Sequence, residues 1–207
     1  MINGLTLGSV YALIALGYTM VYGIIELINF AHGEIYMLGA YMGIITFGLL
    51  TTIHLTSPTS GATLLIMMVM AMLFCGACGV TIERLAYRPL RGASRLSPLI
   101  SALGVSIFLQ NFVMLAQGPR DRGFPHLFAG EGIDLFGSRI SAIQIFIMAT
   151  SVLMMVALQL LVHRTKIGKA MRAAAQDMQM ASLVGIDVDR VISATFLIGS
   201  ALAGVAG

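Results

Sequence analysis

Long apolar runs separated by short polar stretches dominate the chain. Each run approaches or exceeds the ~20 residues that a helix needs to cross ~30 Å of hydrocarbon. The predicted spans cover about 4–25, 35–55, 62–82, 97–116, 140–162 and 191–207. The pattern therefore predicts an all-α fold: one polytopic transmembrane helix bundle that forms a single domain over residues 1–207.

The last run, VISATFLIGSALAGVAG, stays apolar as far as Gly207. A helix that ends inside a bilayer leaves its final carbonyl groups without hydrogen-bond partners. We therefore expect the chain to be truncated at its C-terminus, with further spans beyond residue 207. The first run has no basic residue ahead of it and is too long for a signal-peptide core.

Composition agrees with the membrane class. Hydrophobic residues make up 58% of the 207 residues and charged residues 10%, whereas a soluble domain carries about 25% charged residues. Cys75 and Cys78 form a C-x-x-C pattern beside small residues in an apolar run, so we expect helix packing rather than redox or zinc chemistry. Small residues spaced four apart also favour close helix packing. They are Gly4 and Gly8, Gly39 and Gly43, and Ser200 and Gly204.

Lys and Arg are distributed unevenly. Of the twelve, four lie in 84–96, five in 163–190 and three in 117–140. Because cytoplasmic loops of membrane proteins carry the excess of Lys and Arg, 84–96 and 163–190 are predicted to be cytoplasmic and 117–140 external. Alternation then places 26–34 on the cytoplasmic side and the N-terminus outside.

Polar side chains gather between the first two predicted spans, at Glu26, Asn29, His32 and Glu34. Three interpretations stay open: a solvated turn, a buried network that locks the two helices, or a lining of the translocation path or its gate. Gly33 supports the path, because a helix break there would present backbone amides to an anion. One histidine and two carboxylates are too few ligands for a typical metal site, so we expect no metal and no cofactor.

Residues 163–190 predict an amphipathic helix at about 167–185. Its apolar stripe consists of Ile167, Met171, Ala174, Met178 and Ala181. Its polar face consists of Lys169, Arg172, Gln176 and Gln179. Gly185 is placed to end this helix, and Asp187 is placed to cap the next one. The stripe is small rather than rich in Trp, Phe or Leu, which favours docking on a cytoplasmic protein over resting on lipid.

Four strings together resemble the Liv-type permeases of ABC importers for branched-chain amino acids. They are TLGSVYALIALGYTMVYGIIELINFAHGEIYMLGAY, IERLAYRPLR, LISALGVSIFLQN and KAMRAAAQDMQMASLVGI, in this order along nearly the whole chain. The resemblance implies a multi-pass inner-membrane subunit that is not itself an enzyme and that transports leucine, isoleucine or valine. It implies two cytoplasmic ATPase subunits, a second related permease and a periplasmic binding protein as partners. Family members that carry urea or amides share the pattern from Asn29 to Glu34 and remain the alternative.

The resemblance also implies a cytoplasmic coupling helix that contacts the ATPases. Importer permeases carry a loop of the form Glu-Ala-Ala, three residues, Gly. Ala181 and Gly185 match this form, whereas Gln179 replaces the acid and Met180 replaces an alanine. The coupling residues expected on this basis are Lys169, Arg172, Gln176, Gln179, Ala181 and Gly185. The expected substrate path or gate comprises Asn29, His32, Gly33 and Glu34.

A self-sufficient channel or secondary carrier is the competing class. Such proteins place ionisable residues deep in their spans, whereas here His54 lies near a span end and Glu83 lies next to Arg84. The sequence also contains no Walker-type G-x-x-x-x-G-K-[ST] loop for ATP. These features favour a permease powered by other subunits. A membrane enzyme is the weakest alternative, because no nucleophile and base pair stands out.

Overall fold

A computed structural model describes residues 2–53, 61–94, 96–120, 123, 132–135 and 138–207. Within these residues, six helices are long and apolar enough to cross a membrane. They are α1 (Ile2–Ile25), α2 (His32–Thr52), α3 (Gly61–Ile82), α4 (Leu96–Gln117), α5 (Ala142–Arg164) and α8 (Val188–Ala206). The predicted polytopic helical fold is confirmed. The expectation for His54 lies outside the described residues.

Short elements connect the long helices. A π-helix, η1 (Glu83–Tyr87), and a 3₁₀ turn, η2 (Arg88–Leu90), follow α3, while α6 (Lys166–Gln176) and α7 (Met178–Leu183) lie between α5 and α8. Strands β1 (Gly132–Leu135) and β2 (Ser138–Ser141) form an antiparallel hairpin. The sequence pattern predicted only a polar loop in this region, because its turn-forming residues conceal strands of four residues.

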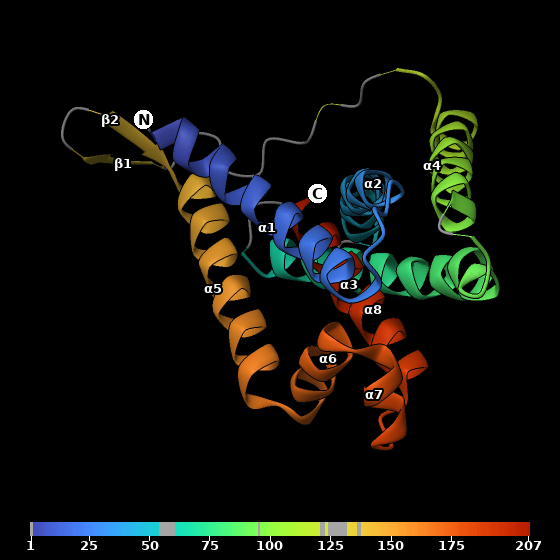
Figure 1. Ribbon diagram of the computed structural model, residues 1–207. Coiled ribbons are helices and arrows are strands. Elements are labelled where there is room, and N and C mark those ends of the chain that lie inside the picture. The colour runs from blue at the N-terminus through green and yellow to red at the C-terminus, as the bar shows by residue number, and fades with distance from the viewer. Residues whose placement is uncertain (1, 54–60, 95, 121–122, 124–131, 136–137) are drawn as a thin grey trace.

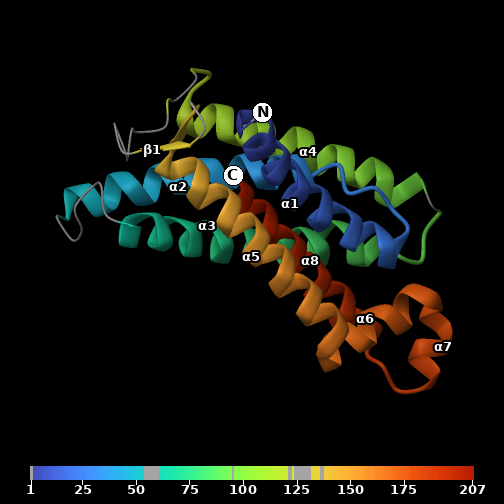
Figure 2. The ribbon, with the colours of Figure 1, turned by 90° about the vertical axis from the view of Figure 1, so that its left-hand side faces the viewer.

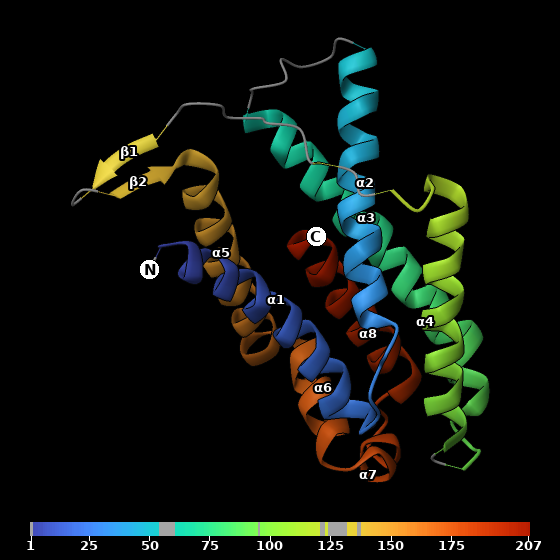
Figure 3. The same ribbon diagram turned by 90° about the horizontal axis from the view of Figure 1, so that it is seen from above.

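Helix α8 lies at the centre of the bundle, with α1, α2 and α3 packed around it. Helix α5 packs on α1, whereas α4 lies at the edge beside α2 and η1 (Figures 1 and 3). The burial of side chains follows this arrangement, since α8 is the most buried of the six long helices and α4 and α5 are the least. The outer faces of α4 and α5 are therefore left for lipid or for another subunit.

Small residues allow α8 to approach its neighbours at backbone distance. A Cβ atom on Gly17 of α1 would lie 2.8 Å from the carbonyl oxygen of Gly199, and one on Gly39 of α2 would lie 2.8 Å from the Cα of Gly204. On α3, a Cβ on Gly79 would overlap Ser200. Side chains larger than hydrogen at these positions would push the helices apart, so the glycines determine the packing of the core.

The predicted pairs of small residues have different outcomes. Gly39, Gly43, Ser200 and Gly204 are all buried, as close helix packing requires. The pair Gly4 and Gly8 was wrong as a packing motif within this chain, because a Cβ on either would meet no described atom within 4 Å. The other two pairs, Gly39 with Gly43 and Ser200 with Gly204, were predicted correctly.

The C-x-x-C cysteines belong to the same helix packing. Both Cys75 and Cys78 are free thiols. Cys75 is fully buried, and its Sγ lies 3.4 Å from the carbonyl oxygen of Ile35.

The two ends of the bundle carry different segments of the chain. We call the end that carries residues 83–94, 163–190 and the turn 26–31 the basic end. The N-terminus and the hairpin lie at the opposite end (Figures 2 and 3), and the Gln144 side chain donates to Asn3 there at 2.7 Å. This alternation agrees with the one inferred from the charges. That the basic end faces the cytoplasm stays a prediction.

The close approach of α2 to α8 yields a matched pair of variants. Gly39→Ala places a methyl group against the Gly204 backbone, and we expect it to lower the free energy of unfolding by about 1–3 kcal/mol. Gly48→Ala lies on the same helix, where a Cβ meets no described atom within 4 Å, and is expected to be neutral or slightly stabilising. Thermal unfolding in detergent measures both; equal midpoints for the two variants would contradict this packing.

Candidate functional site

The turn between α1 and α2 is an irregular segment at the basic end. Glu26, which has a positive φ of 56°, ends α1 and redirects the chain. Asn29 is buried; its Oδ1 accepts a hydrogen bond from Ala31 N at 3.1 Å and another from the Tyr87 hydroxyl at 2.8 Å. The side-chain amide therefore fastens this turn to η1.

His32 begins α2 and points into the bundle. Its side chain is buried and meets Tyr18 edge to face, with 5.8 Å between the ring centroids. Both ring nitrogens and Asn29 Nδ2 lack a hydrogen-bond partner among the described residues. Asn29 and His32 are both buried, and of the two Asn29 is hydrogen-bonded to another element, whereas Glu26 is exposed. Which of the three interpretations holds stays a prediction. The expected helix break at Gly33 was wrong: the break precedes it, and Gly33 lies in the first turn of α2.

Glu34 faces a different direction, toward α4. Its Oε1 accepts hydrogen bonds from Ser106 Oγ at 3.1 Å and from Gln110 Nε2 at 3.4 Å. The sequence grouped Glu34 with Asn29 and His32, but the structure separates them. A residue two positions after His32 lies about 200° around the helix from it, and this places the carboxylate at the edge of the bundle.

The segment expected to form one helix at 167–185 consists of two helices, so that prediction was wrong. Asp177 has extended backbone angles between α6 and α7, and its Oδ1 accepts from Gln179 N at 2.8 Å and Met180 N at 3.0 Å. This side chain caps α7, as Asp is well suited to do, and its capping breaks the helix. Gly185 has the expected left-handed conformation with φ of +86°, and Asp187 caps α8 as predicted.

The faces of α6 and α7 are the reverse of those expected for docking. Met171, Ala174 and Ala181 of the apolar stripe are buried, and α6 packs against α1, α5 and α8. The stripe therefore fixes α6 and α7 to their own bundle, although its first member, Ile167, is exposed. The polar residues of the opposite face are exposed. They are Lys169, Arg172, Gln176 and Gln179.

An apolar tip on α7 was missed by the sequence analysis. Met180, Leu183 and Val184 are 62%, 79% and 76% exposed, and we call these three residues the α7 tip. Their spacing of three and four residues places them on one face of a helix, which is the signal that would have identified them. Figure 1 shows α7 projecting from the bundle below α6.

Two residues fix the corner between α5 and α6. The Arg172 guanidinium donates to the carbonyl oxygen of Val162 at the end of α5. A Cβ on Gly168 would overlap the same carbonyl group, so only glycine allows this close turn. Within this chain, the Arg172 side chain stabilises the C-terminus of α5 and orients α6. Its expected contact with a partner stays a prediction.

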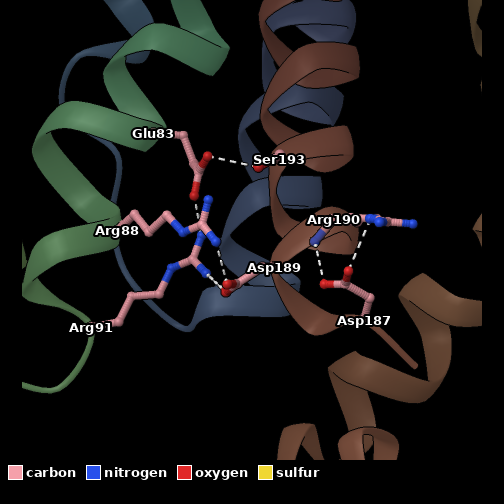
Figure 4. Close-up of polar contacts among 7 residues, drawn as sticks. All are labelled: Glu83, Arg88, Arg91, Asp187, Asp189, Arg190 and Ser193. Carbon is pink, nitrogen blue, oxygen red and sulfur yellow. Dashed lines mark hydrogen bonds and ion pairs between the residues drawn. The ribbon is translucent and has the colours of Figure 1, made fainter. Parts of the chain in front are cut away.

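A network of polar and charged residues joins the segment that directly follows α3 to the start of α8, as Figure 4 shows. Glu83 is 0% exposed; it accepts a hydrogen bond from Ser193 Oγ at 2.7 Å and forms an ion pair with Arg91. Arg91 also pairs with Asp189, which pairs in turn with Arg88 at 2.6 Å. We call Glu83, Arg88, Arg91, Asp189 and Ser193 the α3–α8 network.

Two members of the α3–α8 network, Asp189 and Ser193, follow the α7 tip closely in the chain. A buried carboxylate is costly unless it is paired, and the pairing of Glu83 depends on residues from η2 and α8. The nearby pair of Asp187 with Arg190, 2.9 Å apart, is local to the start of α8 and exposed. Of these ion pairs, the ones in the network connect separate elements, because they join η1 and η2 to the start of α8.

Two variants separate these ion pairs. Glu83→Ala leaves Arg91 without its buried partner, and we expect it to lower the free energy of unfolding by about 3 kcal/mol. Asp187→Asn removes the exposed pair and retains an acceptor for the helix cap, so we expect a change below about 1 kcal/mol. Denaturant titration in detergent compares them, and a Glu83→Ala variant as stable as Asp187→Asn would show that the network is not structurally important.

Comparison with known proteins gives one family. The family described as "Branched-chain amino acid transport system / permease component" matches residues 1–207. LivH of Salmonella typhimurium and BraD of Pseudomonas aeruginosa are named high-affinity branched-chain amino acid transport system permease proteins. Each is 48% identical, over all of this chain and 68% of the relative. A probable branched-chain amino acid transport permease protein LivH of Methanocaldococcus jannaschii is 30% identical over 94% of this chain and 60% of its own length.

No solved structure matches the chain. The relatives are transport permease subunits rather than enzymes, and the six span-capable helices agree with that class. The chain is therefore a multi-pass inner-membrane protein, and it belongs to the family of permease components of branched-chain amino acid transport systems.

Proposed function

We propose that the chain is the membrane-spanning subunit of an ATP-driven importer of leucine, isoleucine and valine. Its relatives carry names of branched-chain amino acid transport, and the sequence has no Walker-type loop of its own. Two cytoplasmic ATPase subunits hydrolyse ATP, a binding protein delivers the amino acid, and a second related permease completes the pore.

The α7 tip is the observation that carries this proposal. Three large apolar side chains project into solvent at the end of a short helix, where their exposure is unfavourable unless another protein covers them. Apolar anchors on a helix fit a groove in a partner protein. We assign the ATPase contact to the α7 tip together with Gln179, while buried Ala181 and left-handed Gly185 give the tip its shape.

The path from this contact into the membrane runs through α8. Residues 185–187 connect α7 to α8, and the α3–α8 network joins the start of α8 to α3 and η2. Lys169 and Gln176 are exposed on α6 and flank the contact. Arg172 and Gly168 hold α6 at its angle to α5, so movement of the docked ATPase displaces α6, α7 and the start of α8 together.

The turn 26–31 is assigned to the inner gate. Asn29 and His32 hold it against η1 and α1, and Gly33 lies beside it on the exposed side of α2. Because η1 also contains Glu83 of the α3–α8 network, a shift of that network moves the Tyr87 hydroxyl on which Asn29 depends. The ionisable residue assigned to the path itself is Glu34.

The docking assignment predicts a selective loss of the ATPases. Leu183→Glu introduces a charge into the α7 tip, and we expect co-purification of the ATPase subunits to fall more than about tenfold, since burying an unpaired charge in an apolar contact costs several kcal/mol and about 1.4 kcal/mol already corresponds to tenfold. Membrane insertion is expected to be unchanged.

The matched control is Ala93→Glu, which adds the same charge at an exposed position of the basic end, after η2. It is expected to retain the ATPases. Equal retention by both variants would remove docking from the α7 tip. The broader proposal is tested by ATP-dependent leucine uptake in vesicles that contain the assembled importer; uptake by this chain alone, driven by an ion gradient, would contradict it.

A further inference from the structure

We propose that the groove between α2 and α4 binds the transported amino acid as a zwitterion, with its ammonium group at Glu34. This inference rests on the proposed function and names the substrate contact within it. The groove joins two features: the Glu34 carboxylate and a cavity of about 290 Å³ further along the same helix pair.

Residues on one face of α2 and one face of α4 lead from Glu34 to the cavity. Glu34, Met37 and Tyr41 are three and seven residues apart on α2, and therefore lie on one face. Ser106 and Gln110 are four residues apart on the facing side of α4. Gln110 connects the two features, because it donates to Glu34 and also lines the cavity.

The inner end of the groove offers an acceptor for a cation. Ser106 and Gln110 both donate to Oε1 of Glu34, and Oε2 accepts no hydrogen bond from the described residues. An ionised carboxylate has about four acceptor sites on its two oxygens. A primary ammonium group has three N–H donors, so it fits the unused oxygen and neutralises a charge that would be costly in a membrane.

The outer end of the groove can receive the carboxylate of an entering amino acid, before its ammonium group reaches Glu34. Asn111 and Arg120 are among the residues that line the cavity, and an amide and a guanidinium group can each donate to a carboxylate. Met37, Val113 and Met114 form its apolar wall, which suits an aliphatic side chain. Glu34 and Tyr41 are separated by about 10 Å along α2. This is longer than the separation of the ammonium and carboxylate groups within one amino acid, so the two ends of the groove are successive positions of the advancing molecule.

Two other cavities lack this chemistry. One of about 270 Å³ lies among α1, α2, α3, α5 and α8, with Thr150 and Ser151 as the hydroxyl groups of an otherwise apolar wall. Another, of about 220 Å³, is lined by aliphatic and methionine side chains. Transfer of an unpaired charge into such surroundings is strongly unfavourable, so neither receives a zwitterion.

A protection experiment tests the groove in the assembled importer. Asn111→Cys, made with Cys75 and Cys78 replaced by alanine, is labelled with a charged maleimide in vesicles without the binding protein. Leucine is expected to slow the labelling. In Glu34→Gln, the leucine concentration that halves the labelling rate is expected to rise about tenfold, because a charge-assisted hydrogen bond is lost. Glu34→Asp retains the carboxylate and is expected to retain protection.

Asp187→Asn is the matched control, since Asp187 is exposed at the start of α8 and lies outside the groove. It should leave protection unchanged, and 4-methylpentanoate, which has no ammonium group, should protect only at concentrations about tenfold higher than leucine. Loss of protection in Asp187→Asn as well, or full protection in Glu34→Gln, would overturn the proposal.

ATP-dependent leucine uptake by the importer that lacks Cys75 and Cys78 but retains Asn111 separates the proposed site from the proposed function. Uptake by this importer without protection of the Asn111→Cys variant contradicts the groove alone, whereas absence of uptake contradicts the proposed function.

Discussion

The close backbone contact between α8 and its three neighbours is the constraint on which the structure depends. Lipid tails are as apolar as leucine side chains, so helices in a bilayer gain little from the hydrophobic effect and associate through packing. Gly17, Gly39 and Gly79 remove the side chains that would keep α8 at a distance. A central helix surrounded on three sides can transmit a displacement to all three neighbours, because packed helices shift together rather than compress.

At the basic end, ion pairs rather than glycine contacts hold α8 against its neighbours. The start of α8 is joined to α3 and η2 through Glu83, Arg91 and Asp189, and the exposed α7 tip precedes this connection by a few residues. The π-helix η1 begins at Glu83 itself, and such widened turns are frequent at functional sites. One end of the molecule thus combines the proposed docking surface, a charged connection and the turn assigned to the proposed gate.

Sequence alone was sufficient for the parts of the molecule set by one dominant interaction. The apolar runs predicted the six long helices. Gly185 predicted the left-handed turn after α7, and Asp187 predicted the cap of α8, because each effect depends only on the local backbone. Asp177 was missed as a helix break, because the amphipathic stripe continues through it while its carboxylate caps α7. The α3–α8 network was also missed, since Glu83 and Asp189 are more than 100 residues apart and no local pattern pairs them.

Grouping by sequence also concealed where polar residues point. Asn29 and His32 face the core, whereas Glu34 faces α4, because two residues of helix are enough to change the face. The direction of the apolar stripe on α6 and α7 was ambiguous in the same way. An apolar stripe on a helix predicts that another surface covers it, but it does not tell which surface. Here the chain covers most of the stripe with its own helices.

The location of Ser182, beside the α7 tip, tests the central claim most directly. In a background without Cys75 and Cys78, a cysteine at this position is treated with a membrane-impermeant thiol reagent in right-side-out and inverted vesicles. The account predicts labelling in inverted vesicles only, with protection by bound ATPase subunits. Labelling from the outside of right-side-out vesicles would place the tip on the wrong side of the membrane and contradict the account.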